Sequence, residues 1–403
     1  MQCTAGAVSN GATVPRLIHL TTIPFTLWVF LRDQVRYVEG QGFEVHALSS
    51  PGPLGEAFAS ETGVPTYAVP MNRGVSPLGD LRSILAIRRH LRRIRPHIVH
   101  AHTPKAGWVG MVASRLAKVP VRIYHLHGLR HRTCSGFTRT LVRRGEVATC
   151  TLAHRVLCVG RSLREAALAD RLCPPDKIAV PASGSIAGVD AAGRFNPARY
   201  PQDERVRQRA ALGVPADASV LGFIGRIVRD KGIAELAHAW RSLRDAHPKA
   251  WLLLVGPLEP EDPVPPQALA ALRADDRVRF AGEVRDPAPL YRAMDLVVLP
   301  THREGFPVVP LEAAAMRLPV VASRCVGCVD AVEDGVTGTL VPVGDAEALA
   351  RALSTYLADP ILRERHGHAG RERVEADFRP DDVFAAQVAE YRSLMEQLAP
   401  RPR

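Results

Sequence analysis

Short apolar runs alternate with longer amphipathic segments along most of this chain. In the first half, runs typical of buried strands stand at 16–20, 43–48, 66–69, 97–101, 121–125, 155–159 and 178–180. Apolar residues at helical spacing predict helices at 26–41, 78–95 and 105–117. Strands that alternate with helices in this way indicate βαβ units, which build a parallel sheet with helices on both faces.

A stretch rich in glycine and proline separates this series from a second one. Residues 182–202 contain three glycines and two prolines without a long apolar run, which is typical of a linker. Beyond it, strands are predicted at 220–224, 251–255, 278–281, 296–299 and 320–322. Helices are predicted at 231–246, 346–357 and 382–398.

The pattern therefore predicts two α/β domains, each a doubly wound parallel sheet. We place the first domain at 15–190, the second at 191–380, and a final helix at 381–398 that packs back on the first domain. Ligands of such sheets lie beyond the carboxyl ends of the strands. With two sheets facing each other, the expected site is the cleft between the domains.

Composition excludes disorder and points to an anionic partner for the first half only. Of the 403 residues, 46% are hydrophobic and 23% charged, which is ordinary for globular proteins. Residues 1–195 hold 25 Lys/Arg and 11 Asp/Glu, a net charge of +14 within a total of +11. Between Asp80 and Glu146 there are 15 Lys/Arg and no acidic residue. Nucleic acid, an anionic membrane leaflet and a phosphorylated substrate all fit this stretch, as does a solvated helix face in an Arg-rich chain.

The sequence predicts a cytoplasmic protein with reduced thiols that at most lies on a membrane. Residues 1–10 lack the basic start and apolar run of a signal peptide. The apolar stretch 23–31 is far shorter than the ~20 residues of a membrane span. Seven cysteines are too few for a disulfide framework. The pair Cys325-x-x-Cys328 lacks further metal ligands nearby and lies outside the first βαβ unit, so neither zinc nor redox chemistry is predicted there.

Two segments can hold an anion. In LGFIGRIVRDKG (221–232), a strand runs into Gly225, Arg226 follows, and Lys231 opens a helix. A guanidinium and an ammonium at a strand end beside a helix start suit a diphosphate, although two ordinary surface cations would look the same.

In LPTHREGFPVVPLEAAAMRLP (299–319), a strand ends at Pro300 and a helix begins near 308 or 309. The loop presents Glu304 and backbone N–H groups, and Glu312 lies in the first helical turns. Paired carboxylates suit ligands rich in hydroxyl groups. Taken alone, a helix-start carboxylate and a solvated glutamate explain the pattern equally well.

Together these motifs resemble the retaining nucleotide-sugar glycosyltransferases of family 4. The resemblance rests on Gly-Arg-(four residues)-Lys-Gly followed by Glu-Gly-Phe-Pro and a second glutamate eight residues after the first, and it extends from residue 17 to 398. It implies the GT-B fold of two facing Rossmann-like domains, a nucleotide-sugar substrate and no cofactor. No D-x-D triplet occurs in the chain, which agrees with the implied absence of a metal.

The resemblance also implies roles for individual residues. Arg226 and Lys231, with Gly225, would bind the donor diphosphate, and Glu304 would contact the donor sugar. Glu312 would bind the ribose, and His127 would lie near the transferred sugar, although a polar residue at a strand end is the simpler interpretation of His127 alone. Contacts to the sugar, phosphate and base would come from further donor-side residues, namely Gly305, Phe306, Pro307, Val308, Val309, Glu283 and Val284.

Motifs of the first half narrow the resemblance to enzymes that extend undecaprenyl-diphosphate-linked sugars at the inner leaflet. These motifs are HAHTPKAG (100–107), YHLHGLR (124–130) and GSIAGVD (184–190). On this basis His102, Lys105 and Arg130 are predicted on the acceptor side, and the basic stretch would contact the anionic leaflet. Thr21-Thr22-Ile23-Pro24 stands where the family usually has a glycine pair.

The leading hypothesis is a glycosyltransferase that uses a UDP-linked sugar and a lipid-linked or polysaccharide acceptor. A non-hydrolysing UDP-sugar 2-epimerase shares the predicted architecture, and a small-molecule glycosyltransferase fits the same motifs. A basic nucleic-acid-binding module ranks last, because aromatic residues make up only 5% of the chain.

Overall fold

The computed structural model describes residues 14–398 apart from 73, 75 and 261. The amino-terminal segment 1–10, on which the signal-peptide prediction depends, lies outside the described residues. Within the described part, no helix is both long and apolar enough to cross a bilayer.

The first half forms a seven-stranded sheet in the order β3-β2-β1-β4-β5-β6-β7. Its strands are β1 (Arg16–Leu20), β2 (Glu44–Ser49), β3 (Thr66–Ala68), β4 (Ile98–His102), β5 (Val121–Leu126), β6 (Arg155–Cys158) and β7 (Ile178–Ala179). The chain reverses its direction across the sheet after β3, so β1 has β2 on one side and β4 on the other. Both pairings are parallel, and His19 of β1 is in register with His100 of β4.

The second half forms a six-stranded parallel sheet in the order β10-β9-β8-β11-β12-β13. Its strands are β8 (Ser219–Ile224), β9 (Ala250–Val255), β10 (Val278–Gly282), β11 (Leu296–Leu299), β12 (Val320–Ser323) and β13 (Gly338–Val341). The strand order reverses between β8 and β11. The carboxyl ends of these two strands therefore flank the topological switch point, where ligands of doubly wound sheets bind.

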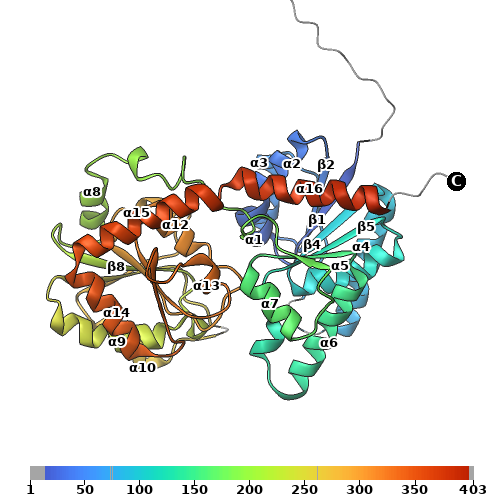
Figure 1. Ribbon diagram of the computed structural model, residues 1–403. Coiled ribbons are helices and arrows are strands. Elements are labelled where there is room, and N and C mark those ends of the chain that lie inside the picture. The colour runs from blue at the N-terminus through green and yellow to red at the C-terminus, as the bar shows by residue number, and fades with distance from the viewer. Residues whose placement is uncertain (1–13, 73, 75, 261, 399–403) are drawn as a thin grey trace, which may run out of the picture. The chain divides into compact units, whose positions relative to one another are not determined.

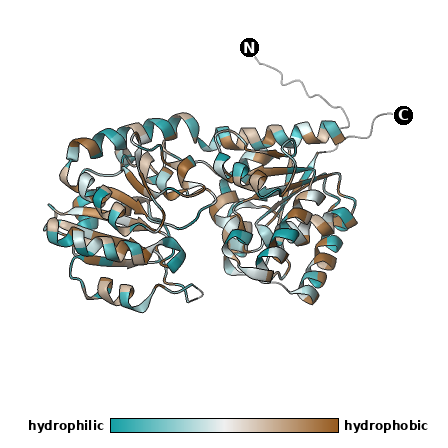
Figure 2. Cartoon of the chain, turned by 60° about the horizontal axis from the view of Figure 1, so that its bottom comes forward, coloured by the Kyte–Doolittle hydropathy of each residue, from teal (hydrophilic) through white to brown (hydrophobic). Residues whose placement is uncertain are grey.

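Helices connect the strands and cover the sheets (Figure 1). Those of the first half are α1 (Pro24–Thr26), α2 (Arg32–Gly40), α3 (Pro53–Thr62), α4 (Pro77–Ile94), α5 (Pro104–Leu116), α6 (Gly136–Leu152) and α7 (Arg161–Ala169). The later ones are α8 (Glu204–Ala211), α9 (Ile233–Ala246), α10 (Pro266–Ala274), α11 (Ala288–Tyr291), α12 (Val309–Ala315), α13 (Cys328–Ala331), α14 (Ala346–Ala358), α15 (Pro360–Asp377) and α16 (Pro380–Leu398). Figure 2 shows strands that are mostly hydrophobic and helices that mix hydrophobic with hydrophilic residues, which is expected when helices cover both faces of a sheet.

The structure confirms the predicted class of two parallel-sheet α/β halves and corrects several elements. The helix predicted at 26–41 starts at Pro24 and contains a π-helical turn, η1 (Leu27–Leu31), before α2. Among the elements that the predicted list omits are α3, α6, α7, α8, α13, α15 and β13. The pattern of apolar residues does not predict helix α15, because glycine and not an apolar side chain occupies part of its buried face. At Gly367 the packing is so close that a Cβ would lie 2.2 Å from the carbonyl oxygen of Arg317.

By their contacts the residues group into two compact units. One contains the residues up to His125, Arg144–Val156 and the chain from Gln387 onward, and the other contains Leu126–Arg143 and Leu157–Ala386. The domain boundaries proposed from the sequence, near 190 and 380, stay a prediction.

Candidate functional site

The loop after β8 places the first predicted cation at the switch point of the second sheet. Gly225 follows the strand with φ +149°, and its N–H donates to the carbonyl of Val255 at 2.9 Å. The exposed side chain of Arg226 then donates from Nη1 to Glu259 Oε2 at 2.8 Å. Arg226 therefore stands at the carboxyl end of β8 with its guanidinium in solvent reach.

Lys231 and Glu304 form an ion pair between the loops that follow β8 and β11. Lys231 ends a short 3₁₀ helix, η4 (Arg229–Lys231), and its Nζ donates to Glu304 Oε1. The two side chains are only 15% and 14% exposed. Gly232 permits this approach, because its φ is +71° and a Cβ there would lie 1.9 Å from the carbonyl oxygen of Pro300. Two charges withdrawn from water each depend on the other for compensation.

The segment that follows Glu304 presents backbone donors. Within the described chain, the N–H groups of Gly305, Phe306, Val308 and Val309 donate to no other backbone group. Gly305 lies against another backbone segment, since a Cβ there would be 1.8 Å from the carbonyl oxygen of His127. Val308 caps helix α12, whose Glu312 N–H donates to the Val308 carbonyl at 2.9 Å. The loop thus offers N–H groups suited to an oxyanion.

Glu312 is held by a tyrosine that the sequence interpretation did not include. Tyr291 donates from its hydroxyl to Glu312 Oε2 at 2.7 Å, and the ring is buried. Burial raises the pKa of Glu312, while the Tyr291 hydrogen bond opposes that rise. Burial together with the neighbouring carboxylate raises the pKa of Tyr291 well above its usual value. Tyr291 therefore stays a hydrogen-bond donor and fixes one oxygen of Glu312, which leaves the other oxygen to a ligand.

The remaining donor-side residues take separate positions. Glu283 and Val284 follow β10, with Glu283 exposed and Val284 half-buried. Phe306 is half-buried and packs on Phe378, at a ring separation of 5.7 Å, while Pro307 is buried. His127 follows β5 and is half-buried, and desolvation lowers its pKa to about 4. The imidazole of His127 is consequently neutral at pH 7.

The predicted acceptor-side residues lie at, or a few residues after, the carboxyl ends of β4 and β5. His102 ends β4, is fully buried, and its Nε2 lies 3.0 Å from His19 Nδ1. Lys105 in the first turn of α5 donates to both oxygens of Asp80, at 2.7 and 2.8 Å, so its charge is already compensated. Arg130 is exposed at the start of a 3₁₀ helix, η2 (Arg130–Thr133).

Thr22, which stands in the segment where the family usually has a glycine pair, makes hydrogen bonds to the start of α5. Its Oγ1 accepts from the N–H of Ala106 at 3.1 Å in the first turn of α5. The same oxygen lies 2.6 Å from Oγ1 of Thr103, the residue before α5, which has φ +71°. The hydroxyl pair therefore ties the loop after β1 to the start of α5 at the switch point of this sheet.

Three buried histidines of the first unit lie close enough together to hold a metal ion. Ligand atoms of His19, His100 and His102 lie within 4.8 Å of one another. His100 Nδ1 lies 2.7 Å from the Tyr391 hydroxyl, and His100 Nε2 lies 3.2 Å from His125 Nδ1. Such spacing is that of imidazoles that share protons in hydrogen bonds.

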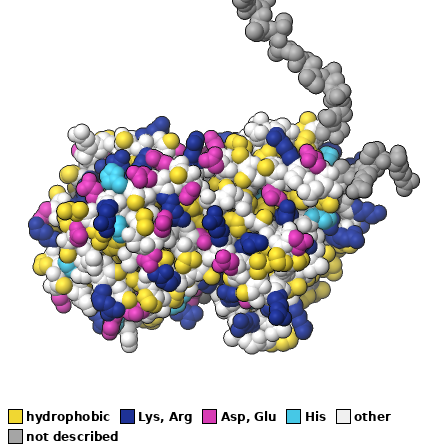
Figure 3. All heavy atoms as spheres, in the orientation of Figure 1, with side chains coloured by type: hydrophobic (Ala, Val, Ile, Leu, Met, Phe, Trp, Pro, Cys, Tyr) yellow, Lys and Arg dark blue, Asp and Glu magenta, His cyan; other side chains and the backbone are white. Residues whose placement is uncertain are grey.

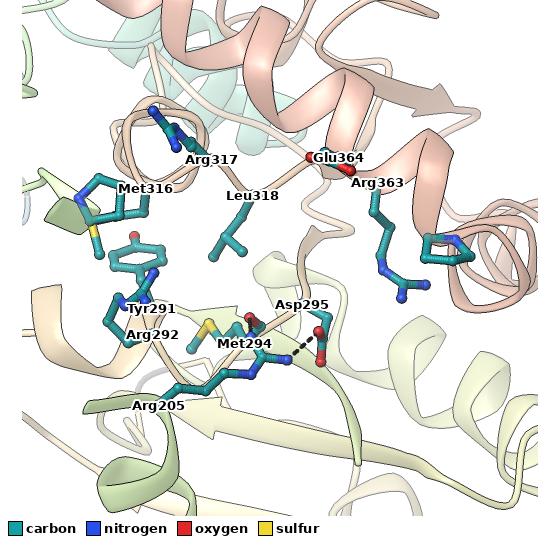
Figure 4. A pocket seen from close by; sticks show the side chains of 12 residues that line it. Arg205, Tyr291, Arg292, Met294, Asp295, Met316, Arg317, Leu318, Arg363 and Glu364 are labelled. Carbon is teal, nitrogen blue, oxygen red and sulfur yellow. Dashed lines mark hydrogen bonds and ion pairs between the residues drawn. The ribbon is translucent and has the colours of Figure 1, made fainter. Parts of the chain in front are cut away.

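A surface cavity of about 290 Å³ lies elsewhere in the second unit, as Figure 4 shows. Met294 and Asp295, which precede β11, line it together with Met316, Arg317 and Leu318, which precede β12. It therefore opens at the amino ends of the strands, opposite the edge at which Lys231 and Glu304 meet. An ion pair between Arg205 and Asp295 at 2.5 Å crosses one wall. We do not assign the donor to this cavity.

Two family models match this chain. Residues 218–359 match the family described as "Glycosyl transferases group 1", and residues 26–184 match "Glycosyl transferase 4-like domain". A capsular polysaccharide biosynthesis glycosyltransferase, CapM of Staphylococcus aureus, is 30% identical over 95% of this chain and 98% of its own length. A UDP-Gal:alpha-D-GlcNAc-diphosphoundecaprenol alpha-1,3-galactosyltransferase of Escherichia coli is 26% identical over 82% of this chain and 84% of its own.

Solved structures share the fold across almost the whole chain. The sucrose-phosphate synthase of Thermosynechococcus elongatus superimposes with a TM-score of 0.78 at 22% identity, over 95% of this chain and 100% of its own. The Anabaena protein HepE, solved in complex with UDP and glucose, gives a TM-score of 0.76 at 22% identity, over 94% of this chain and 100% of its own. With the seven- and six-stranded parallel sheets, these similarities confirm the predicted GT-B fold.

Proposed function

This chain belongs to the glycosyltransferases, with a 4-like domain in its first half and a group 1 domain in its second, and we propose that it transfers a sugar from a UDP-linked donor to a lipid-linked or polysaccharide acceptor. The observation that carries this proposal is the Lys231–Glu304 ion pair at the carboxyl ends of β8 and β11. It joins a cation suited to phosphate with a carboxylate suited to hydroxyl groups at the switch point where a donor would bind.

The proposed chemistry follows from the charges at this point. Breaking the bond between sugar and phosphate builds negative charge on the departing diphosphate, and a fixed cation lowers the energy of that state. Lys231 and Arg226 would supply the positive charge, and the backbone N–H groups of Gly305, Phe306, Val308 and Val309 would bind phosphate and sugar oxygens. Glu304 would exchange its contact with Lys231 for hydroxyl groups of the sugar, and Glu312 would accept from the ribose.

We further propose that the anomeric configuration is retained and that no metal takes part. Glu304 is engaged by Lys231, which suits a positioning carboxylate better than a nucleophile. A same-face attack, in which the leaving phosphate accepts the proton of the acceptor hydroxyl, then yields retention. With His127 neutral at pH 7, its ring can donate or accept a hydrogen bond at the sugar without adding charge.

The test is a thermal-shift screen of the purified protein with UDP, GDP, ADP, dTDP and their sugars. We expect stabilisation by UDP and UDP-sugars, unchanged by EDTA, since a ligand that binds only the folded state raises its stability. The double variant Arg226→Ala/Lys231→Ala should lose the shift. An unchanged shift in that variant would mean that the diphosphate does not bind at this site. A shift that requires a divalent ion would contradict metal-free binding.

An acceptor embedded in a membrane is supported by a surface of the first unit. Helix α4 exposes Leu78, Leu81 and Leu85, spaced three and four residues apart and therefore on one face. Exposed arginines accompany them on the same helix, at positions 82, 89, 92 and 93. On the face of the molecule that Figure 3 shows, basic side chains lie among hydrophobic ones. Apolar side chains among cations are typical of proteins that lie on anionic bilayers.

Replacing Arg89, Arg92 and Arg93 together by glutamine should weaken binding to anionic vesicles at least ~10-fold, because each cation near the surface contributes about 1 kcal/mol. Vesicle flotation at low and high salt measures the effect, and UDP binding should not change. A matched triple variant at Arg241, Arg273 and Arg351, which are exposed in the second unit, serves as control. Equal losses in both triples would show that only net charge matters and would contradict a defined membrane face.

A further inference from the structure

Two cysteines that the proposed reaction does not use lie on one turn beside the donor-site carboxylate. Cys325 follows β12 and is half-buried, while Cys328 begins α13 and is buried. The N–H of Val329 donates to the Cys325 carbonyl at 3.3 Å, which closes one helical turn around the pair. Residues three apart on such a turn face the same side, which is the placement that a disulfide between them requires.

The two thiols influence each other's ionisation. The neighbouring Cys328 thiol and backbone N–H lower the pKa of Cys325, and the Cys325 thiol together with burial raises the pKa of Cys328. An accessible sulfur with thiolate character next to a buried thiol is the arrangement in which the first attacks an oxidant and the second resolves the product.

The turn also packs directly on the proposed donor site. At Gly327, which has φ +82°, a Cβ would lie 2.5 Å from the carbonyl oxygen of Gly305 and 3.2 Å from Cβ of Glu304. The Gly327 N–H donates to Ser162 Oγ at 2.9 Å, so the turn is anchored on its other side. A change in the shape of this turn therefore reaches Glu304 through backbone contact.

We propose that Cys325 and Cys328 are a reversible oxidation site, at which a peroxide converts the two thiols to a disulfide and thereby slows sugar transfer. The Cys325 thiolate attacks the O–O bond, which breaks to release water and leaves a sulfenic acid. Cys328 loses its proton and attacks that sulfur, so that an S–S bond forms and a second water leaves. Two electrons pass from the thiols to the peroxide. The site itself is independent of the enzymatic activity, whereas the slowing of transfer rests on the proposed function.

The test follows the tryptic peptide 325–351, which holds both thiols, after graded hydrogen peroxide and alkylation. We expect this peptide to lose both alkylation sites together and to become lighter by two hydrogen atoms, before Cys134 or Cys173 reacts, and dithiothreitol should reverse the change. Cys325→Ser should leave Cys328 open to alkylation, and Cys134→Ser should behave like the wild type. Oxidation of Cys325 alone, or reaction no faster than that of Cys134, would overturn the site.

Activity is measured on the same samples. We expect a loss of about 10-fold or more in kcat/KM on oxidation, because small displacements of catalytic groups cost that much, with full recovery in dithiothreitol and no loss in Cys325→Ser. A disulfide that leaves transfer unchanged would overturn the coupling to Glu304. A disulfide in a protein whose reduced form transfers no sugar and binds no nucleotide would support the oxidation site and overturn the proposed function.

Discussion

Replacing Lys231 by alanine should lower kcat/KM for sugar transfer at least ~100-fold with the fold intact, because groups that stabilise developing charge contribute that much. The Lys231 side chain is only 15% exposed and its ammonium is held by Glu304, so water cannot take its place without rearrangement. Steady-state kinetics with the donor identified by the nucleotide screen measure the effect, and circular dichroism checks the fold.

Lys249 offers a matched control within the same unit. It also pairs with a carboxylate, Asp217 at 2.8 Å, but its side chain is 72% exposed and lies outside the site. Lys249→Ala should therefore leave kcat/KM within about twofold, since exposed ion pairs contribute little. Comparable losses in the two variants would mean that Lys231 acts through general stability rather than at the diphosphate.

Glu304→Gln should distinguish the roles of the two paired residues, because it should not weaken UDP binding although it lowers the rate of sugar transfer. In the free protein the carboxylate engages the ammonium that we assign to the diphosphate. The neutral amide removes this competing charge, so UDP should bind at least as tightly as to the wild type, while transfer should fall as steeply as in Lys231→Ala. Weaker UDP binding in Glu304→Gln would contradict the assignment of Glu304 to the sugar.

The sequence was sufficient for the fold and for the order of the site motifs, because both depend on local patterns. Strand ends, glycines at close approaches and helix starts are visible within a dozen residues, as at Gly225, Arg226 and Lys231. The pairing of Lys231 with Glu304 was not visible, because it spans 73 residues and depends on β8 lying beside β11. Only the strand order brings these loops together.

Other partners of site residues escaped the sequence for the same reason. Tyr291 lies 21 residues before Glu312, and no motif connects the two. Lys105 looked like a cation available to an acceptor, yet Asp80, 25 residues earlier, holds it with both oxygens. The spacing of Cys325 and Cys328 was noted and set aside, because the sequence does not show that their turn packs on Glu304. In each case the residue type suggests a possible role, but the sequence does not show which distant residue lies beside it in the folded protein.

Acidification should destabilise the first unit well before its carboxylates are protonated, because His19 is buried as a neutral ring. Its side chain is 0% exposed, and desolvation lowers its pKa to about 3. In the unfolded chain His19 has its ordinary pKa near 6.5 and binds a proton below that pH, whereas in the folded protein it stays neutral down to about pH 3. The contribution of His19 to stability is therefore fully present above about pH 6.5 and is lost as the pH falls toward 3. One such group costs about 2 kcal/mol between pH 7.5 and pH 5.

Urea denaturation at pH 7.5, 6 and 5 measures this slope, and His19→Gln should remove its share of it whatever the variant does to absolute stability. The exposed His368 provides the control, since His368→Gln should keep the wild-type slope. His100, His102, His125 and the Tyr391 hydroxyl form hydrogen bonds around His19. A proton on His19 would place a charge among these buried side chains, where desolvation opposes it. A slope unchanged in His19→Gln would mean that these neighbours, rather than His19, take up the proton.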